Sequence, residues 1–92
     1  MKKTSFYSLH IGNKAILHDG YTDSNFWYYK HGRIWFAIYP ETGTAVATEL
    51  TRKAVAQKAH ARLESVVKFY SNHPEWADTF NEACRKATFH ED

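Results

Sequence analysis

The chain has few of the features that mark secreted or membrane proteins. Its 92 residues include a single cysteine, Cys84, which cannot form an internal disulfide and so favours the reducing cytoplasm over secretion. No apolar run approaches the roughly 18 residues of a membrane-spanning helix. The basic start, residues 1–4, is not followed by the long apolar stretch of a signal peptide. We therefore expect a cytoplasmic protein with no membrane partner.

Catalytic and metal-binding motifs are also missing from the sequence. There is no Gly-x-Ser-x-Gly motif, no phosphate-binding glycine loop and no dinucleotide fingerprint. The six histidines lack the paired spacing of zinc ligands, so we expect no metal site. His10 and His18 can face each other across the first hairpin only if its turn departs from two residues. We expect no catalytic residues and no cofactor, and therefore not an enzyme.

What the chain does have is the composition of one soluble globular domain spanning residues 1–92. Hydrophobic residues make up 43% and charged residues 24%, which argues against disorder. The net charge of +2 is too small to imply nucleic-acid binding by itself. Its distribution is uneven, because residues 51–68 carry five cations and one acid whereas residues 75–92 carry five acids and two cations.

The first half of the chain has the pattern of short strands. Turn signals at Gly12-Asn13, Asp19-Gly20, His31-Gly32 and Pro40–Gly43 separate segments of β-branched and aromatic residues that alternate with period two. This pattern predicts an antiparallel β-meander of four to five strands between about residues 4 and 48.

The second half changes to a helical period. Residues 49–70 contain no glycine or proline and carry apolar residues at helical spacing, so we predict one helix there, capped by Thr48 or Thr51. A second helix is predicted for residues 73–88, with Asn72 as its cap. The fold class is therefore α+β, a meander followed by two α-helices packed on one face.

An aromatic hairpin stands out within the meander, because residues 26–39 hold seven aromatic side chains around one glycine. A type I′ turn at His31-Gly32 sorts the side chains onto two faces. The more apolar face, which we assign to the core beneath the helices, carries Trp27, Tyr29, Ile34, Phe36 and Ile38. The other face carries Phe26, Tyr28, Lys30, Arg33, Trp35, Ala37 and Tyr39.

That second face has two interpretations. It is covered by other strands, by the N-terminal arm or by a second subunit, since aromatic residues on strands mostly serve packing. Alternatively it is an exposed platform that stacks on bases or fills a pocket of a partner. In that case Lys30 and Arg33 meet phosphate or carboxylate groups.

The basic stretch of the longer predicted helix also has two interpretations. Its cations are Arg52, Lys53, Lys58, Arg62 and Lys68, diluted only by Glu64. They form either a solvated face or a surface that attracts an acidic target, whether phosphate or protein.

In size and in its lack of catalytic motifs, the chain resembles the small accessory and inhibitor proteins of bacteriophages and mobile elements, including anti-defence proteins. That resemblance implies a protein that works by occupying a surface. Our first hypothesis is a non-catalytic binding protein for an acidic protein or ribonucleoprotein complex. The predicted partner-binding residues are Tyr28, Lys30, Arg33, Trp35, Tyr39, Arg52, Lys53, Lys58 and Arg62.

Two other hypotheses remain open. In one, the protein is a homodimer or larger assembly whose subunits meet through the aromatic sheet face. In the other, it is a regulator that binds DNA or RNA directly, although no helix-turn-helix pattern precedes the predicted helix at residues 49–70.

Overall fold

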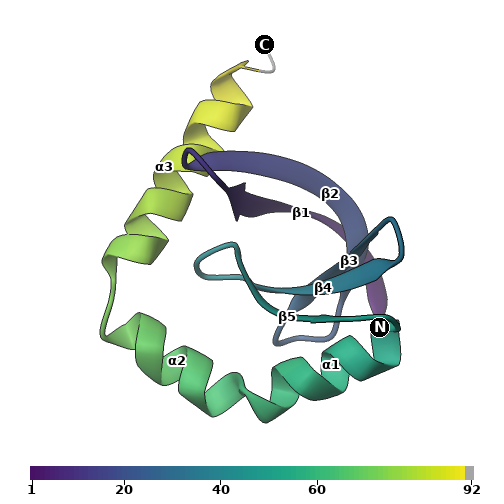
Figure 1. The fold of residues 1–92 in the computed structure, drawn as a ribbon. Helices are drawn as coiled ribbons and strands as arrows, with labels where there is room; N and C mark the ends of the chain where they lie inside the picture. Colours follow the sequence, from purple (N-terminus) through teal and green to yellow (C-terminus); the bar gives the residue numbers. More distant parts are fainter. Residues whose placement is uncertain (91–92) are drawn as a thin grey trace.

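The computed structural model describes the backbone of residues 1–90 and the side chains of residues 1–87. A five-stranded antiparallel meander is followed by three helices that run around two sides of it (Figure 1), which confirms the predicted α+β class. The strands are β1 (Lys2–His10), β2 (Lys14–Thr22), β3 (Trp27–His31), β4 (Ile34–Tyr39) and β5 (Thr44–Glu49). The helices are α1 (Arg52–Ala61), α2 (Leu63–Ser71) and α3 (Glu75–His90).

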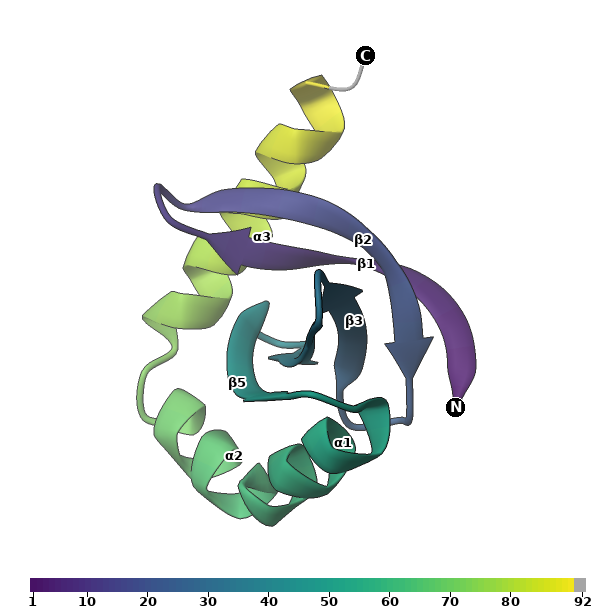
Figure 2. The same ribbon diagram turned by 45° about the vertical axis from the view of Figure 1, so that its right-hand side comes forward.

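The β1–β2 hairpin forms an arch over the other strands (Figure 2). The bend is possible because residue 20 is glycine and has no side chain. A Cβ at this position would lie only 2.0 Å from the carbonyl oxygen of Tyr28. Strand β2 therefore continues through Gly20, where the sequence predicted a connection. At the far end of the arch, the Leu9 N–H donates to the carbonyl of Gly43 at 2.7 Å, which joins β1 to the β4–β5 turn.

The β3–β4 hairpin turns at Gly32-Arg33, one residue later than predicted. His31 pairs with Ile34, so Tyr29 lies opposite Phe36 instead of Ile34. Only the first central residue has a positive φ (+62° at Gly32), which is the pattern of a type II′ turn. The predicted partners are therefore wrong by two positions. Because this offset is even, every side chain keeps its predicted face.

Two cores lie on opposite faces of this hairpin. The helices were predicted to cover the more apolar face, and this prediction is wrong. Helix α1 covers the face of Tyr28 and Tyr39, where Val55 and Ala59 complete the buried cluster. The more apolar face instead packs beneath the β1–β2 arch, around Phe6. The reason is the bend in β2, which places the first hairpin over that face and leaves the opposite face to the helices. We call the face of the hairpin that lies under the helices the outer face, and the face that lies under the arch the inner face.

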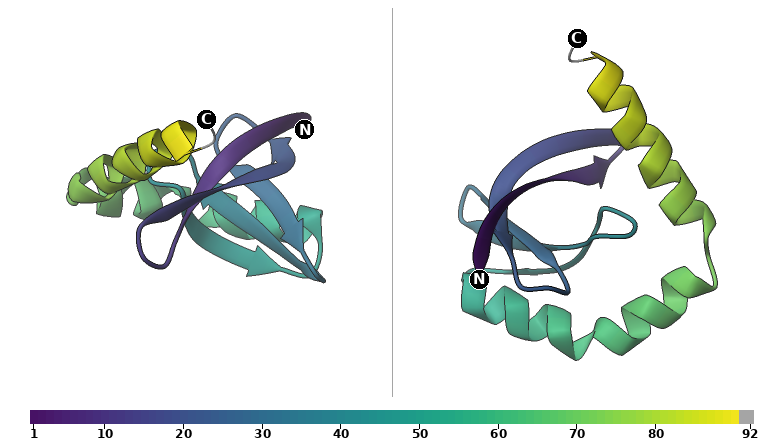
Figure 3. Two further views of the ribbon diagram at one scale, coloured as in Figure 1. Left: turned by 90° about the horizontal axis from the view of Figure 1, so that it is seen from above. Right: turned by 180° about the vertical axis from the view of Figure 1, so that it is seen from behind.

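The single helix predicted for residues 49–70 is two helices. Arg62 ends α1 and begins α2 with φ −98° and ψ −2°, and the bend is visible in Figure 3. It brings α2 back to the sheet, where the ring of Tyr70 stacks on Tyr39 with centroids 5.5 Å apart. At the start of α1 the Thr51 hydroxyl accepts from the Ala54 N–H at 3.1 Å, which confirms one of the two predicted caps.

Helix α3 packs against the arch. Asn72 ends α2 and does not cap α3, which begins at Glu75. Phe80 and Ala83 are buried, and the ring of Phe80 fills the space where a side chain at Gly43 would lie. None of the described helices combines the length and apolar character needed to cross a membrane.

Candidate functional site

Two of the predicted anchor residues are part of the core. Tyr28 is fully buried and Tyr39 is 7% exposed, so the prediction that they contact a partner or a second subunit is wrong. The reason is that α1 and α2 cover this part of the outer face. The phenol of Tyr28 donates to Asp23 Oδ2, and burial together with this bond raises its pKa.

Asp23 fixes the β2–β3 connection against α1. Its Oδ2 lies 2.7 Å from His60 Nε2, and its Oδ1 accepts the N–H groups of Asn25 and Phe26. Burial alone would raise the pKa of Asp23, but the hydrogen bonds from Tyr28, His60 and the backbone lower it. This cluster has a structural role, since it anchors the loop beneath which Tyr28 is buried.

Beyond the N-terminal end of α1, the outer face is open. The guanidinium of Arg52 lies over the ring of Tyr21, 4.4 Å from its centroid, and 6.0 Å from the centroid of Trp35. The two rings are 6.2 Å apart and tilted by 46°. In the part of the chain that the structure describes, this guanidinium forms no hydrogen bond or ion pair with the protein. Its N–H groups are therefore free to bind an external acceptor.

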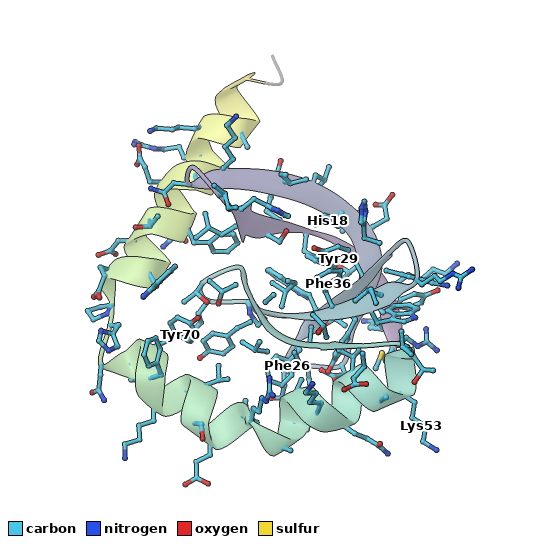
Figure 4. The ribbon with its side chains drawn as sticks, viewed as in Figure 1. His18, Phe26, Tyr29, Phe36, Lys53 and Tyr70 are labelled. Carbon is cyan, nitrogen blue, oxygen red and sulfur yellow. The ribbon has the colours of Figure 1, made fainter. Side chains whose placement is uncertain are left out.

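Three further cations belong to residues that neighbour Trp35 or Arg52. Lys30 is the cross-strand neighbour of Trp35, and Arg33 lies in the adjacent turn. Lys53 points away from α1 into solvent (Figure 4). We call this group the cationic corner; it consists of Tyr21, Lys30, Arg33, Trp35, Arg52 and Lys53. Five of the nine predicted binding residues are thus Arg52, Trp35 or near neighbours of these two.

The corner also contains residues that the sequence analysis missed. Tyr21 was not predicted, because the strand was expected to end at His18. Lys3 pairs with Tyr21 across the β1–β2 hairpin and adds a further cation on this side. The alternation of residues along β2 would have placed Tyr21 on the outer face only if the strand had been extended through Gly20.

Two acids near the corner have partners of their own. Glu49 lies opposite Trp35 in the β4–β5 register, and its Oε2 binds Lys58 Nζ at 3.1 Å. Asp23 Oδ2 binds the Tyr28 hydroxyl and His60 Nε2. Beside Arg52 there is a shallow hollow of about 680 Å³. The residues that line it are Met1, Asp23, Arg52, Lys53, Ala56, Gln57 and His60. The surface that they expose to the hollow is mainly apolar, because carbon atoms make up most of it.

The remaining predicted cations, Lys58 and Arg62, contact the protein's own sheet. Arg62 Nη1 donates to the Val46 carbonyl at 2.7 Å, and Lys58 Nζ donates to the Thr48 carbonyl at 3.4 Å. Both acceptors belong to β5, the last strand of the sheet. Unpaired carbonyls on such an edge invite another strand, and positively charged side chains are a common protection against it. These two side chains therefore lie over the β5 edge and outside the cationic corner.

The corner is suited to bind an oxyanion. A guanidinium presents two parallel N–H groups that match a carboxylate or a phosphate, and the ring beneath it limits its mobility. Tyrosine, tryptophan and arginine are also the residues most often found at the energetic centre of protein interfaces. The chain matches none of the protein-family models, curated proteins or solved structures with which it was compared.

Proposed function

We propose that the protein is a non-catalytic binding protein that occupies the surface of an acidic target through the cationic corner. The observation that carries the proposal is the position of Arg52, held over Tyr21 at 4.4 Å with no acidic partner among the described residues. The target presents a carboxylate of an acidic protein or a phosphate of a nucleic-acid-containing complex. Occupying that surface in the cytoplasm would block the target, as small accessory inhibitors of bacteriophages and mobile elements do.

The contributions of the residues differ. Arg52 supplies directional hydrogen bonds, and its stacked position lowers the entropy lost on binding. Lys30, Arg33 and Lys53 are exposed and supply long-range attraction, which raises the association rate and weakens with salt. Trp35 is half-buried and contributes apolar contact next to the anion.

The test begins with affinity capture from cell lysate, with and without nuclease, followed by affinity measurements on the purified target. Arg52→Ala should weaken binding by about tenfold or more, equivalent to roughly 1.4 kcal/mol. Lys53→Glu should also weaken binding. Its matched control is Lys68→Glu, which makes the same charge change on the exposed surface of α2 and should have little effect.

The two outcomes that contradict the proposal are distinct. Unchanged affinity of Arg52→Ala would remove the corner from the binding surface. Equal losses in Lys53→Glu and Lys68→Glu would show that only net charge matters. Loss of the captured target after nuclease treatment would show that nucleic acid, and with it phosphate, belongs to the target; retention would show that the target is a protein surface.

A further inference from the structure

A polar cluster lies on the inner face, away from the cationic corner. Ser8 is 1% exposed, and its Oγ lies 2.7 Å from the Nε2 atoms of both His10 and His18. The β1–β2 loop has three residues, Ile11–Asn13, so His10 pairs with Lys14 and Phe6 with His18. This register places both histidines on the inner face, the arrangement that a two-residue turn would not allow. We call these three residues the His–Ser–His cluster.

His18 also belongs to the packing that holds the arch in place. Its ring stacks on Tyr29 with centroids 3.8 Å apart, and Tyr29 stacks on Phe36 at 5.0 Å. Figure 4 shows His18, Tyr29 and Phe36 in succession between the arch and β4. The cluster thus joins the arch to the inner face through both a hydrogen-bond network and a stack of rings.

The network requires that at least one of the two histidines is neutral. A serine hydroxyl has one proton to donate, so in the neutral state one imidazole accepts from Ser8 and the other donates to it. If both imidazoles are protonated, both Nε2–H groups point at Ser8 Oγ, and the serine proton must turn elsewhere. Because Ser8 is buried, that proton cannot reach solvent, and the Tyr29 hydroxyl, which also hydrogen-bonds with Ser8, is left as its acceptor.

The charges around the cluster are unfavourable to protonation as well. The rings of His10 and His18 are 5.7 Å apart, Lys14 lies opposite His10, and His31 on β3 adds a third imidazole. Burial, followed by the charges of His10 and His31, lowers the pKa of His18. The next carboxylate on β2, Asp19, lies on the other side of the strand and accepts from Ser5 at 2.7 Å. Tyr29, the other titratable group in contact, remains neutral in this range.

We propose that the His–Ser–His cluster is a proton-sensitive lock that holds the β1–β2 arch over the inner face at neutral pH and releases it in mild acid. A histidine that is harder to protonate in the folded state stabilises that state fully above its unfolded pKa of about 6.5. This contribution is lost as the pH falls below that value. Release exposes the inner rings of Trp27, Tyr29 and Phe36 while the outer core under α1 stays intact.

The test is backbone amide hydrogen exchange, measured by NMR at pH 7.5 and pH 5.0 and corrected for intrinsic rates. In the wild-type protein, protection of the β1 and β2 amides should fall at least tenfold more than that of the β4 and β5 amides. His18→Gln keeps a hydrogen-bonding group that cannot titrate, and should remove most of this difference. His73→Gln, at a partly exposed histidine beside Glu75, is the control and should behave as wild type.

Uniform loss of protection over all five strands, or no loss at all, would overturn the proposal. So would a wild-type pH response in His18→Gln. If that variant does not fold, the imidazole signals of the wild-type protein decide. His18 must then titrate over the same pH range in which arch protection falls, and titration outside that range would refute the lock.

Discussion

The cations of α1 look alike in the sequence but make different contacts in the structure. Arg52 lies over Tyr21, Lys53 projects into solvent, and Arg62 reaches a carbonyl of β5. Spacing along a helix shows which side chains share a side, but it does not show what the sheet presents to them. The difference matters for function, because only a cation without a partner in its own chain can bind a target without first breaking a bond.

Among the aromatic residues too, the contacts of a side chain could not be predicted from its position in the strand, and Tyr28 is an example. Removing its hydroxyl tests what the bond to Asp23 contributes to stability. Tyr28→Phe removes the bond to Asp23 Oδ2 while leaving the ring in the outer core. We expect a loss of about 1 to 2 kcal/mol in the free energy of unfolding, measured by urea denaturation. The control is Tyr7→Phe, because the Tyr7 hydroxyl has no hydrogen bond within the described part of the chain. Equal losses in the two variants would mean that the bond to Asp23 contributes nothing specific.

At the scale of elements, glycines decide where one element can approach another. Gly43 has φ +66°, and a Cβ there would lie 2.2 Å from Cε1 of Phe80 on α3. Gly12 has a similar φ of +83°, but a Cβ there would have no atom within 4 Å. Alanine would therefore strain the backbone at both positions, but it would collide with a neighbouring side chain only at Gly43.

This pair separates strain from packing. Gly12→Ala should cost about 1 kcal/mol of unfolding free energy, the usual cost of a side chain at positive φ. Gly43→Ala should cost at least about 2 kcal/mol more, because Phe80 must leave its position or the turn must move. Thermal and urea unfolding of the two variants measure the difference. Similar costs would show that α3 is not held tightly against the β4–β5 turn.

At the scale of the whole molecule, the exposed edge of β5 bears on oligomeric state. Lys58 and Arg62 donate to its carbonyls, so their removal leaves the edge open to a second copy. We expect the double variant Lys58→Ala/Arg62→Ala to self-associate at high micromolar concentration in sedimentation velocity. Lys68→Ala/Lys86→Ala changes the net charge equally and should match the wild-type protein. Identical behaviour of the two variants would show that the edge needs no such protection.

The sequence was sufficient to predict the meander and the alternation of side chains, but not the full length of β2 or how the layers stack. Trp27 and Tyr28 are on opposite faces, as their alternation predicted. Which face the helices cover depends on the bend at Gly20, a close approach between backbones that has no sequence periodicity. The break at Arg62 was equally hidden, since good helix formers stand on both sides of it. Of the corner, Lys30, Arg33, Trp35, Arg52 and Lys53 were predicted, whereas Tyr21 required the true end of β2.

The back-to-back cores have a consequence for changes in chain length. Each strand of the β3–β4 hairpin places consecutive residues in opposite cores, so inserting one residue in either strand would exchange the two sets of side chains. We expect this hairpin to accept almost no insertions or deletions. The Ile11–Asn13 loop is the opposite case, because Ile11 is 99% exposed and belongs to neither core. A fluorophore or epitope tag placed there would report on the protein at little cost to its folding.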